Sequence, residues 1–244
     1  MIDHAWLRDW VQPQHLQGDA IESYGRAFAS HPARLLVLKD FLLDEVAEKL
    51  SRFLSREAQF KSVYGLYSKT VRHGNISDVS QQTWLEAQEQ SRFYRFSDYR
   101  SVVDEYRLSP NLVLFQDFLS ALRDHKFKTF FECLSGFEFG PIPLINAYSY
   151  RAGDFLASHS DDVKSKRLSF VFYLSKDWDH HFGGLLHMID PQGGTTVVEP
   201  DYNSMIIFDV AAKTTHFIAP VESSAGQRAR LTISGWFLKP EAAR

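Results

Sequence analysis

The sequence predicts an α+β fold, in which N-terminal helices buttress a double-stranded β-helix, a cupin-like form of jelly roll. Apolar residues recur at helical spacing within the first 140 residues, whereas from Leu144 the chain consists of short β-rich runs separated by turn residues. Short strands of this kind are typical of a jelly roll or a barrel. The change near residue 140 has no long polar or Pro/Ser-rich linker. We therefore expect one domain over residues 1–244, with mostly helical support in 1–140 and a jelly-roll core in 141–240.

The N-terminal part is expected to contain one short strand and three helices. The clearest helix covers residues 42–53, where apolar residues have helical spacing and Asp44 and Glu45 lie near the start, at which the helix dipole favours acidic side chains. Two further helices are predicted over 111–120 and 123–133, and a short strand over 33–41. Residues Gly65–Tyr99 are polar, dotted with aromatic residues and weakly periodic, so we interpret them as a loop or excursion.

The β-rich part is expected to hold seven strands, with turns at 151–154, 190–194 and 223–226. Side chains at alternate positions of a strand share a face, so each strand can present one row of residues to an interior cavity. The candidate strands are residues 144–150, 167–174, 184–189, 195–199, 204–209, 215–220 and 229–238.

The composition indicates a globular protein. Hydrophobic residues make up 44% of the chain and aromatic residues 14%, which is ample material for a packed core. The formal net charge of −3 gives no reason to expect nucleic acid or an anionic membrane as a partner. Cys133 is the only cysteine, so we expect no intrachain disulfide and a reducing, cytoplasmic setting. We recognise no signal peptide, and no run approaches the roughly 18 apolar residues of a membrane span.

His159, Asp161 and His216 are the candidate metal ligands. Side chains two positions apart point the same way on an extended chain, so His159 and Asp161 would share a face. A second imidazole from a distant strand would complete the two-His, one-carboxylate set of non-haem Fe(II) oxygenases, which leaves positions open for oxygen and a co-substrate. An isolated H-x-D motif is more often part of a surface loop, and a single strand histidine such as His216 is usually a core or edge residue. The surrounding sequence is what favours a metal site.

Four ordered motifs carry a resemblance to the prolyl-hydroxylase-like 2-oxoglutarate/Fe(II) oxygenases. Tyr150–Asp161 resembles their Y-x-x-G-D-x-L-x-x-H-x-D run, and Arg167–Asp179 with the following Gly-Gly-Leu-Leu at 183–186 looks like their YLN…W…GG.L region. His216 and Arg230–Phe237 resemble their distal histidine and R-x-x-I-S-G-W-F ending. This ending is closest to the branch of ribosomal-protein and translation-factor prolyl hydroxylases. The resemblance covers the C-terminal half well and implies that His159, Asp161 and His216 bind Fe(II).

Arg230 is the candidate residue for binding the co-substrate. On the predicted strand it shares a face with Thr232, Ser234 and Trp236, and an inward arginine in an apolar strand is costly unless it is paired. This position therefore requires a ligand or an internal acid. The resemblance implies the far carboxylate of 2-oxoglutarate, which a guanidinium can hold with two parallel hydrogen bonds. Arg228 competes for this role, but Arg230 has the offset to Trp236 that the motif requires, and we interpret Arg228 as a solvated strand-end residue.

The resemblance implies three further co-substrate residues. Tyr173 is expected to offer a hydroxyl to the same carboxylate, and Ser234 to add another. Tyr150 is expected to line the co-substrate pocket.

The remaining candidates are expected on the substrate side or near the metal. Trp236 is expected to pack near the iron, and His187 to face the barrel interior. Arg167 belongs to a small basic cluster with Lys164 and Lys166, in a region that can meet substrate in this family; its other interpretation is a solvated loop. A histidine pair at 180–181 offers alternative ligands, but it lies beside the two glycines in a predicted turn and is expected to be exposed or substrate-facing.

The resemblance implies a dioxygenase that depends on Fe(II), 2-oxoglutarate and O2, with ascorbate as a supporting reductant. The expected reaction hydroxylates an unactivated C–H bond of an amino acid, a peptide or an amino-acid-derived small molecule, and it releases succinate and CO2. Two alternatives stay open at this point. One is a prolyl hydroxylase acting on a protein substrate, and the other is a non-catalytic cupin-like module that binds or senses a metal. The sequence leaves the oligomeric state open.

Overall fold

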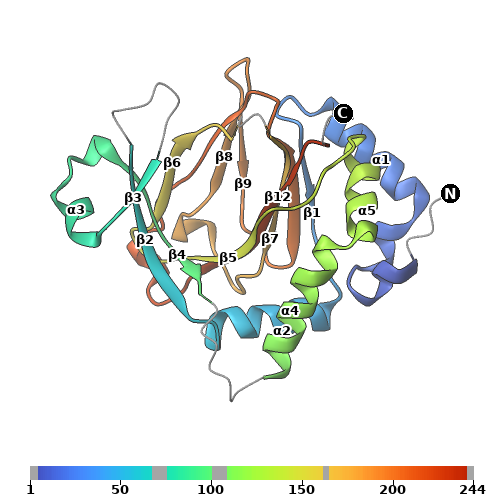
Figure 1. Cartoon of the computed structure of the whole chain (residues 1–244), viewed down its shortest axis with the longest axis horizontal. Helices are drawn as coiled ribbons and strands as arrows, with labels where there is room; N and C mark the ends of the chain where they lie inside the picture. Colours follow the sequence, from blue (N-terminus) through green and yellow to red (C-terminus); the bar gives the residue numbers. More distant parts are fainter. Residues whose placement is uncertain (1–4, 68–75, 101–108, 162–164, 241–244) are drawn as a thin grey trace.

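The computed structural model describes residues 5–67, 76–100, 109–161 and 165–240. It confirms the predicted α+β class, because a curled antiparallel sheet occupies the centre of the molecule and helices pack against its outer face (Figure 1). The strand predicted over 33–41 and the helices predicted over 42–53, 111–120 and 123–133 are all present. An additional helix over 18–30, which was not predicted from the sequence, lies beside the last of these helices.

Four of the helices form the support layer, in which α1 packs against α5 and α2 against α4. Ser109 caps α4 by accepting a hydrogen bond from the Leu112 backbone N–H at 3.0 Å, and Pro110 follows at the first helical turn. None of the helices in the described ranges is long and apolar enough to cross a membrane. The helices are α1 (Gly18–Ser30), α2 (Asp44–Arg56), α3 (Gln81–Glu86), α4 (Pro110–Arg123) and α5 (His125–Ser135), with 3-10 turns η1 (Ala5–Asp9), η2 (Pro13–Leu16), η3 (Glu89–Ser91), η4 (His180–Phe182) and η5 (Ser223–Ala225).

Twelve strands within the described ranges form the sheet, in the order β1-β10-β7-β12-β5-β4-β6-β11-β8-β9, with β2 on β4 and β3 on β2. The seven strands predicted for the C-terminal half are confirmed as β5 and β7 to β12, and β6 is additional. The bounds are β1 (Leu35–Leu38), β2 (Phe60–Tyr67), β3 (Ile76–Val79), β4 (Arg92–Tyr99), β5 (Ile145–Tyr150), β6 (Phe155–His159), β7 (Lys166–Tyr173), β8 (Leu186–Ile189), β9 (Thr195–Val198), β10 (Ser204–Asp209), β11 (Thr215–Ile218) and β12 (Arg230–Leu238).

The interpretation of Gly65–Tyr99 as a loop or excursion was wrong. The described part of this segment contains the end of β2, all of β3, α3 and β4, whereas residues 68–75 lie outside the description. β4 pairs with both β5 and β6 and so becomes part of the central sheet. The physical reason is the aromatic content of β2 and β4, which suits a pleated, half-buried surface.

The alternation of side chains along the strands separates the hydrophobic core from an interior cavity. On β7, Phe172 points outward and meets the ring of Phe118 from α4 edge-on at 5.2 Å, whereas the next residue, Tyr173, lines the cavity. On β12, Leu231, Ile233 and Phe237 join the helix-covered core, and Arg230, Thr232, Ser234 and Trp236 line the cavity. The predicted shared face of β12 is therefore the cavity face.

Candidate metal centre and co-substrate cavity

The turn between β5 and β6 positions the first candidate ligand. Asp154 accepts hydrogen bonds from the Arg151 backbone N–H at 2.9 Å and from Nε of Arg95 in β4 at 2.7 Å. Gly153 has a φ of +82°, and a Cβ there would collide with the same guanidinium. The Gly-Asp pair of the sequence motif thus fixes the start of β6, at whose end His159 lies.

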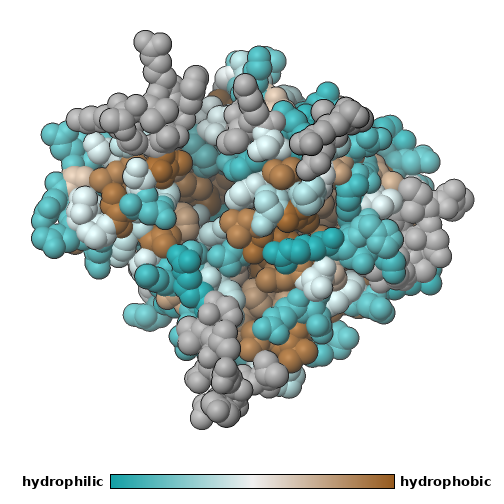
Figure 2. All heavy atoms as spheres, in the orientation of Figure 1, coloured by the Kyte–Doolittle hydropathy of each residue, from teal (hydrophilic) through white to brown (hydrophobic). Residues whose placement is uncertain are grey.

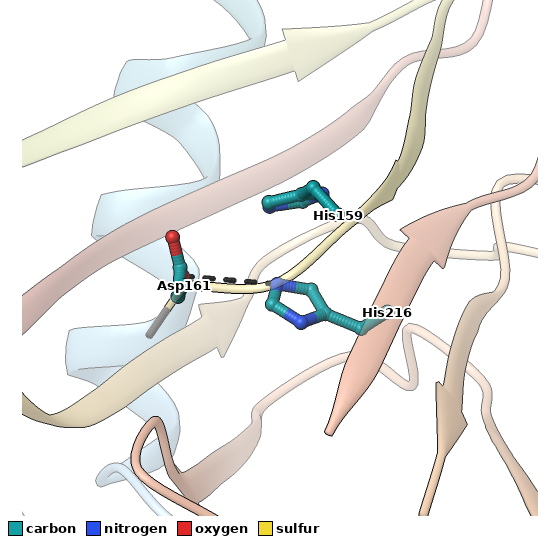
Figure 3. A group of neighbouring side chains, drawn as sticks. All are labelled: His159, Asp161 and His216. Atoms are coloured by element: carbon teal, nitrogen blue, oxygen red, sulfur yellow. Dashed lines mark ion pairs between the residues drawn. The ribbon is translucent and has the colours of Figure 1, made fainter. Parts of the chain in front are cut away.

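His159 and His216 meet because they are direct partners in the antiparallel register of β6 and β11. Their ring centroids are 4.2 Å apart, with an angle of 54° between the ring planes. His216 is 5% exposed and packs edge-on against Phe208. Two imidazoles that are far apart in the sequence therefore share one small space (Figure 3).

Asp161 completes the group two residues after His159. Its Oδ2 lies 3.7 Å from His216 Nε2, a spacing that two donors can span when each is about 2.1 Å from one metal ion. One ligand atom from each of the three side chains lies within 4.8 Å of the others, and Figure 3 shows the three groups converging from two strands and a loop. The arrangement can supply the two-His, one-carboxylate face of a divalent metal site.

The protonation states favour metal binding. Burial and the nearby His159 lower the pKa of His216 to about 4, against the opposing charge of Asp161, so this imidazole is neutral at pH 7. His159 Nδ1 lies 2.9 Å from the Ala157 carbonyl oxygen, which can only accept; Nδ1 therefore carries the proton and Nε2 is left to bind a metal. Burial alone would raise the pKa of Asp161, but the electrostatic interactions with the nearby Lys166, His216 and His159 outweigh it and lower that pKa.

A cavity of about 330 Å³ connects these ligands to Arg230. Arg230 is 2% exposed, forms no ion pair with any residue in the described ranges, and its Nε has no hydrogen-bond partner there. Its guanidinium carbon lies 5.1 Å from the ring centroid of Tyr150 and 5.0 Å from that of Tyr173. A buried cation without a carboxylate is unfavourable, so the cavity is suited to an anionic group at this end.

A pair of glycines makes room for this arginine. Gly183 and Gly184 both have positive φ, +66° and +67°. A Cβ on Gly184 would lie 3.1 Å from Cδ of Arg230, and one on Gly183 would run into the Pro220 carbonyl oxygen. The glycine pair of the sequence motif is thus required by the backbone and by the close approach of Arg230.

The other predicted co-substrate residues also line the cavity. Tyr173 is fully buried, and its hydroxyl has no hydrogen-bond partner among the described residues. Burial raises the pKa of Tyr173, with the Arg230 charge opposing, so the hydroxyl remains a hydrogen-bond donor. Tyr150 and Ser234 are lining residues as well. The structure therefore brings Arg230, Tyr173, Tyr150 and Ser234 to the same cavity as the metal ligands.

Two of the three substrate-side candidates lie elsewhere, and these expectations are corrected. His187 stacks on Phe217 with ring centroids 4.5 Å apart, on the side of β8 opposite the buried Leu186 and Met188, so it does not line the cavity. Arg167 ion-pairs with Asp209 at 3.4 Å and covers the ring of Phe137. The β7–β12 register shifts at this point, so Lys166 and not Arg167 takes the cavity-lining position. Trp236 does line the cavity.

Of the neighbouring basic and histidine residues that the structure describes, Lys166 lines the cavity, whereas Arg228 and the histidine pair are exposed. Arg228 is exposed, with its guanidinium carbon 5.1 Å from the Phe182 ring centroid, and it does not reach the cavity. His180 and His181 are exposed in η4, beside Asp179. Lys166 lines the cavity and pairs with Asp161 at 2.9 Å, whereas Lys164 lies outside the described residues.

Sequence reasoning missed an aromatic wall of the cavity. Phe93, Tyr94 and Phe96 of β4 and Tyr148 of β5 line the cavity, and the Phe93 ring meets the His159 ring edge-on at 5.5 Å. The space-filling view shows hydrophobic residues gathered around a hollow near β2, β3 and β4 (Figure 2). The alternating aromatic run of residues 92–99 was the signal that could have identified this strand.

Comparison with known proteins relates the β-core to one family. Residues 145–238 match the model of the 2OG-Fe(II) oxygenase superfamily. The prolyl 3-hydroxylase OGFOD1 of Mus musculus is 31% identical over 135 residues, which are 52% of this chain and 24% of that protein. The prolyl 3,4-dihydroxylase OGFOD1 of Ostreococcus tauri is 30% identical over 149 residues, 55% of this chain and 27% of that protein. The chain thus spans about a quarter of the length of these curated relatives.

The fold as a whole has solved counterparts. The crystal structure of a Pseudomonas putida prolyl-4-hydroxylase aligns with a TM-score of 0.59 and 18% identity, covering 90% of this chain and 99% of that one. The alignment includes the helical support layer as well as the β-core. At this identity the likeness concerns the fold.

Proposed function

We propose that this chain, whose residues 145–238 match the model of the 2OG-Fe(II) oxygenase superfamily, is a member of that superfamily and a dioxygenase that hydroxylates a prolyl residue of a peptide or protein. The cofactors of the superfamily are Fe(II), 2-oxoglutarate and O2, and the co-products of such a hydroxylation are succinate and CO2. One observation carries the proposal: three side chains that can bind a metal converge at a cavity that also holds Arg230, a buried cation with no carboxylate partner among the described residues.

The three side chains fit Fe(II). Imidazole nitrogen and carboxylate oxygen are ligands that suit this ion, and a set of three protein ligands leaves positions open for a co-substrate and oxygen. His159 presents Nε2 because its Nδ1 donates to the Ala157 carbonyl, and the low pKa of His216 keeps that imidazole unprotonated. Asp161 is ionised because neighbouring positive and histidine groups lower its pKa. Asp161 and His216 would thus bind the metal in the protonation state that they already have.

The opposite end of the cavity fits the far carboxylate of 2-oxoglutarate. Arg230 would hold it through the guanidinium fork, and Tyr173 would add a hydroxyl that is buried and without a partner in the described ranges. A single anionic ligand between these two groups and the metal would accept hydrogen bonds from both of them. Ser234 and Tyr150 would complete the walls of this end.

When bound, iron and 2-oxoglutarate supply the oxidising chemistry that converts a C–H bond into C–OH. The residues of the chain hold and orient these groups. The β6–β11 register fixes the two histidines opposite each other, and the β12 strand sets Arg230 at the far end of the cavity. Aromatic and aliphatic walls, including Phe208 and Ile218, exclude water from the space between.

The aromatic wall supports a prolyl residue as the target. A pyrrolidine ring within a peptide is apolar and carries no charge, which suits a surface formed by Phe93, Phe96 and Trp236. A free amino acid would bring an ammonium and a carboxylate into this wall. The names of the two curated relatives favour the same target. The sequence alone favoured an amino acid, a peptide or an amino-acid-derived small molecule; among these and the protein alternative, we therefore prefer a prolyl residue of a peptide or protein.

The decisive experiment measures succinate release and substrate mass with Fe(II), 2-oxoglutarate and ascorbate. Proline-containing peptides are compared with the same peptides carrying alanine in place of proline, and with free L-proline. We expect one added oxygen atom on proline-containing peptides alone, and loss of all turnover in His216→Ala. Phe96→Ala is expected to raise the KM for the peptide.

Other outcomes would point to the alternatives. Oxygen added to a free amino acid and to no peptide would establish the small-molecule version. Absence of turnover, together with metal binding that 2-oxoglutarate does not alter, would favour the non-catalytic module. Whether 2-oxoglutarate alters metal binding is measured in the absence of oxygen. Fe(II) and 2-oxoglutarate together should then give a weak visible charge-transfer band, and His216→Ala should abolish it.

A further inference from the structure

A second cavity lies on the outer side of the strands that hold Arg230. Its volume is about 330 Å³, and it is bounded by α2 and by the chain around the ends of β5, β7 and β12. Ser149 and Leu231, which are register partners on β5 and β12, face this cavity, whereas the adjacent Tyr150 and Arg230 face the metal site. The two cavities share no lining residue. In Figure 1, α2 runs across this end of the barrel.

The rim of this second cavity is positively charged. Arg56, Arg151, Lys176 and Arg228 line it, and Asp177 is the only carboxylate among its lining residues. This gives a formal surplus of three positive charges in a chain whose net charge is −3. Lys176 is partly neutralised by an ion pair with Glu48.

The three arginines retain most of their hydrogen-bonding capacity. Arg56 forms no hydrogen bond or ion pair through its side chain within the described ranges. Arg151 donates only from Nη1, to the Gln227 carbonyl oxygen at 3.2 Å, and Arg228 packs against the Phe182 ring. A guanidinium carries five N–H donors, so each of these side chains can still donate to a ligand.

The floor of the cavity consists of serine hydroxyls on buried residues. Ser51, Ser149 and Ser175 are 4%, 1% and 2% exposed. Ser175 Oγ accepts the Leu231 backbone N–H at 2.6 Å, which leaves its own O–H free to donate into the cavity. Ser51 and Ser149 have no side-chain hydrogen-bond partner in the described part of the chain. These hydroxyls are therefore available to donate a hydrogen bond to water or to a ligand in the cavity.

We propose that this second cavity binds a small oxyanion of multiple charge, a phosphate group or a polycarboxylate. Its side chains are rich in donors and poor in acceptors, which is the complement of an oxyanion. The guanidinium fork matches phosphate and carboxylate oxygens bidentately. The volume lies at the lower end of the range of about 300–1,000 Å³ that small-molecule sites occupy. This proposal is independent of the reaction at the metal site.

The test titrates inorganic phosphate, and separately citrate, into the full chain by calorimetry. We expect saturable binding with one site per chain, and a Kd that rises about tenfold or more in Arg56→Gln because one direct charge-assisted contact is lost. The matched control is Arg52→Gln, since Arg52 lies one turn earlier on α2 and does not line the cavity. This control should bind as the wild-type protein does. Phosphate binding without citrate binding would identify a phosphate site, and the reverse a polycarboxylate site.

A thermal measurement gives a second readout. Phosphate stabilises many proteins through exclusion from their surface, but that effect is the same in Arg56→Gln and Arg52→Gln. A larger rise in unfolding temperature in Arg52→Gln than in Arg56→Gln would support the site. The proposal would be overturned if Arg56→Gln and Arg52→Gln bound each anion with the same affinity. It would also be overturned if neither anion saturated the protein at about 10 mM. Binding that is lost in Arg230→Met and kept in Arg56→Gln would place the anion in the metal cavity and also overturn it.

Discussion

Lys166 Nζ lies 2.9 Å from Asp161 Oδ1, while the other oxygen of the same carboxylate faces His216 Nε2 at 3.7 Å. The ammonium also lies 3.9 Å from the ring centroid of Trp236, so it is held between an acid and an aromatic face. The Lys166 side chain is only 16% exposed. Lys166 thus holds one oxygen of Asp161 and leaves the second directed at the candidate metal site.

Replacing Lys166 by methionine should weaken divalent metal binding. Outer partners that orient metal ligands typically contribute roughly 10–100-fold to affinity, and Lys166→Met removes the only side-chain hydrogen bond of Asp161 in the described ranges. We expect Co(II) affinity, followed by its visible absorption, to fall about tenfold. Lys166→Arg should restore part of it, and Lys49→Met, on an exposed face of α2, should have no effect. A gain in affinity would mean that the lysine competes with the metal for Asp161.

Replacing Arg230 by methionine should have opposite effects on binding and stability. Removing one partner of a buried charge pair costs about 2–5 kcal/mol, so 2-oxoglutarate affinity in the presence of Mn(II) should fall about hundredfold or more. The ligand-free protein should be as stable as the wild type or more stable, because an unpaired buried cation is replaced by an apolar side chain. Calorimetry and urea unfolding measure the two quantities. Arg228→Met should change neither, and an equal loss of affinity in that variant would contradict the assignment of Arg230.

The placement of the candidate metal ligands and of Arg230 could be predicted because local backbone rules decide it. The H-x-D motif requires only an extended chain, and the shared face of Arg230 and Trp236 follows from the period of two along a strand. His187 shows where this reasoning fails. β8 is a strand as predicted, but Leu186 and Met188 occupy the buried face, so the alternation turns His187 away from the cavity.

The aromatic wall could not be predicted because it depends on long-range pairing. Tyr94 and Arg95 of β4 pair with Leu156 and Phe155 of β6, about sixty residues further along the chain, and no local pattern specifies this partner. Lys166 is a similar case. Its sequence context resembles a solvated basic loop, and only the approach of β12 places Trp236 against it.

The stability of the metal-free protein should fall as the pH decreases below 6.5. The pKa of His216 is lowered from 6.5 to about 4 in the folded state, chiefly by burial, so between these values the unfolded chain binds a proton that the folded chain does not. The stabilisation is fully present above pH 6.5, and this residue should account for a loss of about 3 kcal/mol by pH 4. Urea unfolding from pH 7 to 4 measures the slope. His216→Asn should show a flatter profile, and identical slopes would exclude His216 as the source.

Alanine at Gly184 should damage both stability and co-substrate binding. Gly184 and Gly193 both have positive φ, +67° and +88°, so alanine at either position should cost about 1 kcal/mol of backbone strain. They differ in their surroundings: a Cβ at Gly184 would lie 3.1 Å from both Arg230 Cδ and Val221 Cγ2, whereas one at Gly193 would meet nothing within 4 Å. Gly184→Ala should therefore be the less stable variant and should bind 2-oxoglutarate less tightly, because Arg230 must move. Gly193→Ala should retain wild-type affinity, and an equal effect of both substitutions on 2-oxoglutarate binding would show that backbone strain, and not contact with Arg230, explains the glycine at 184.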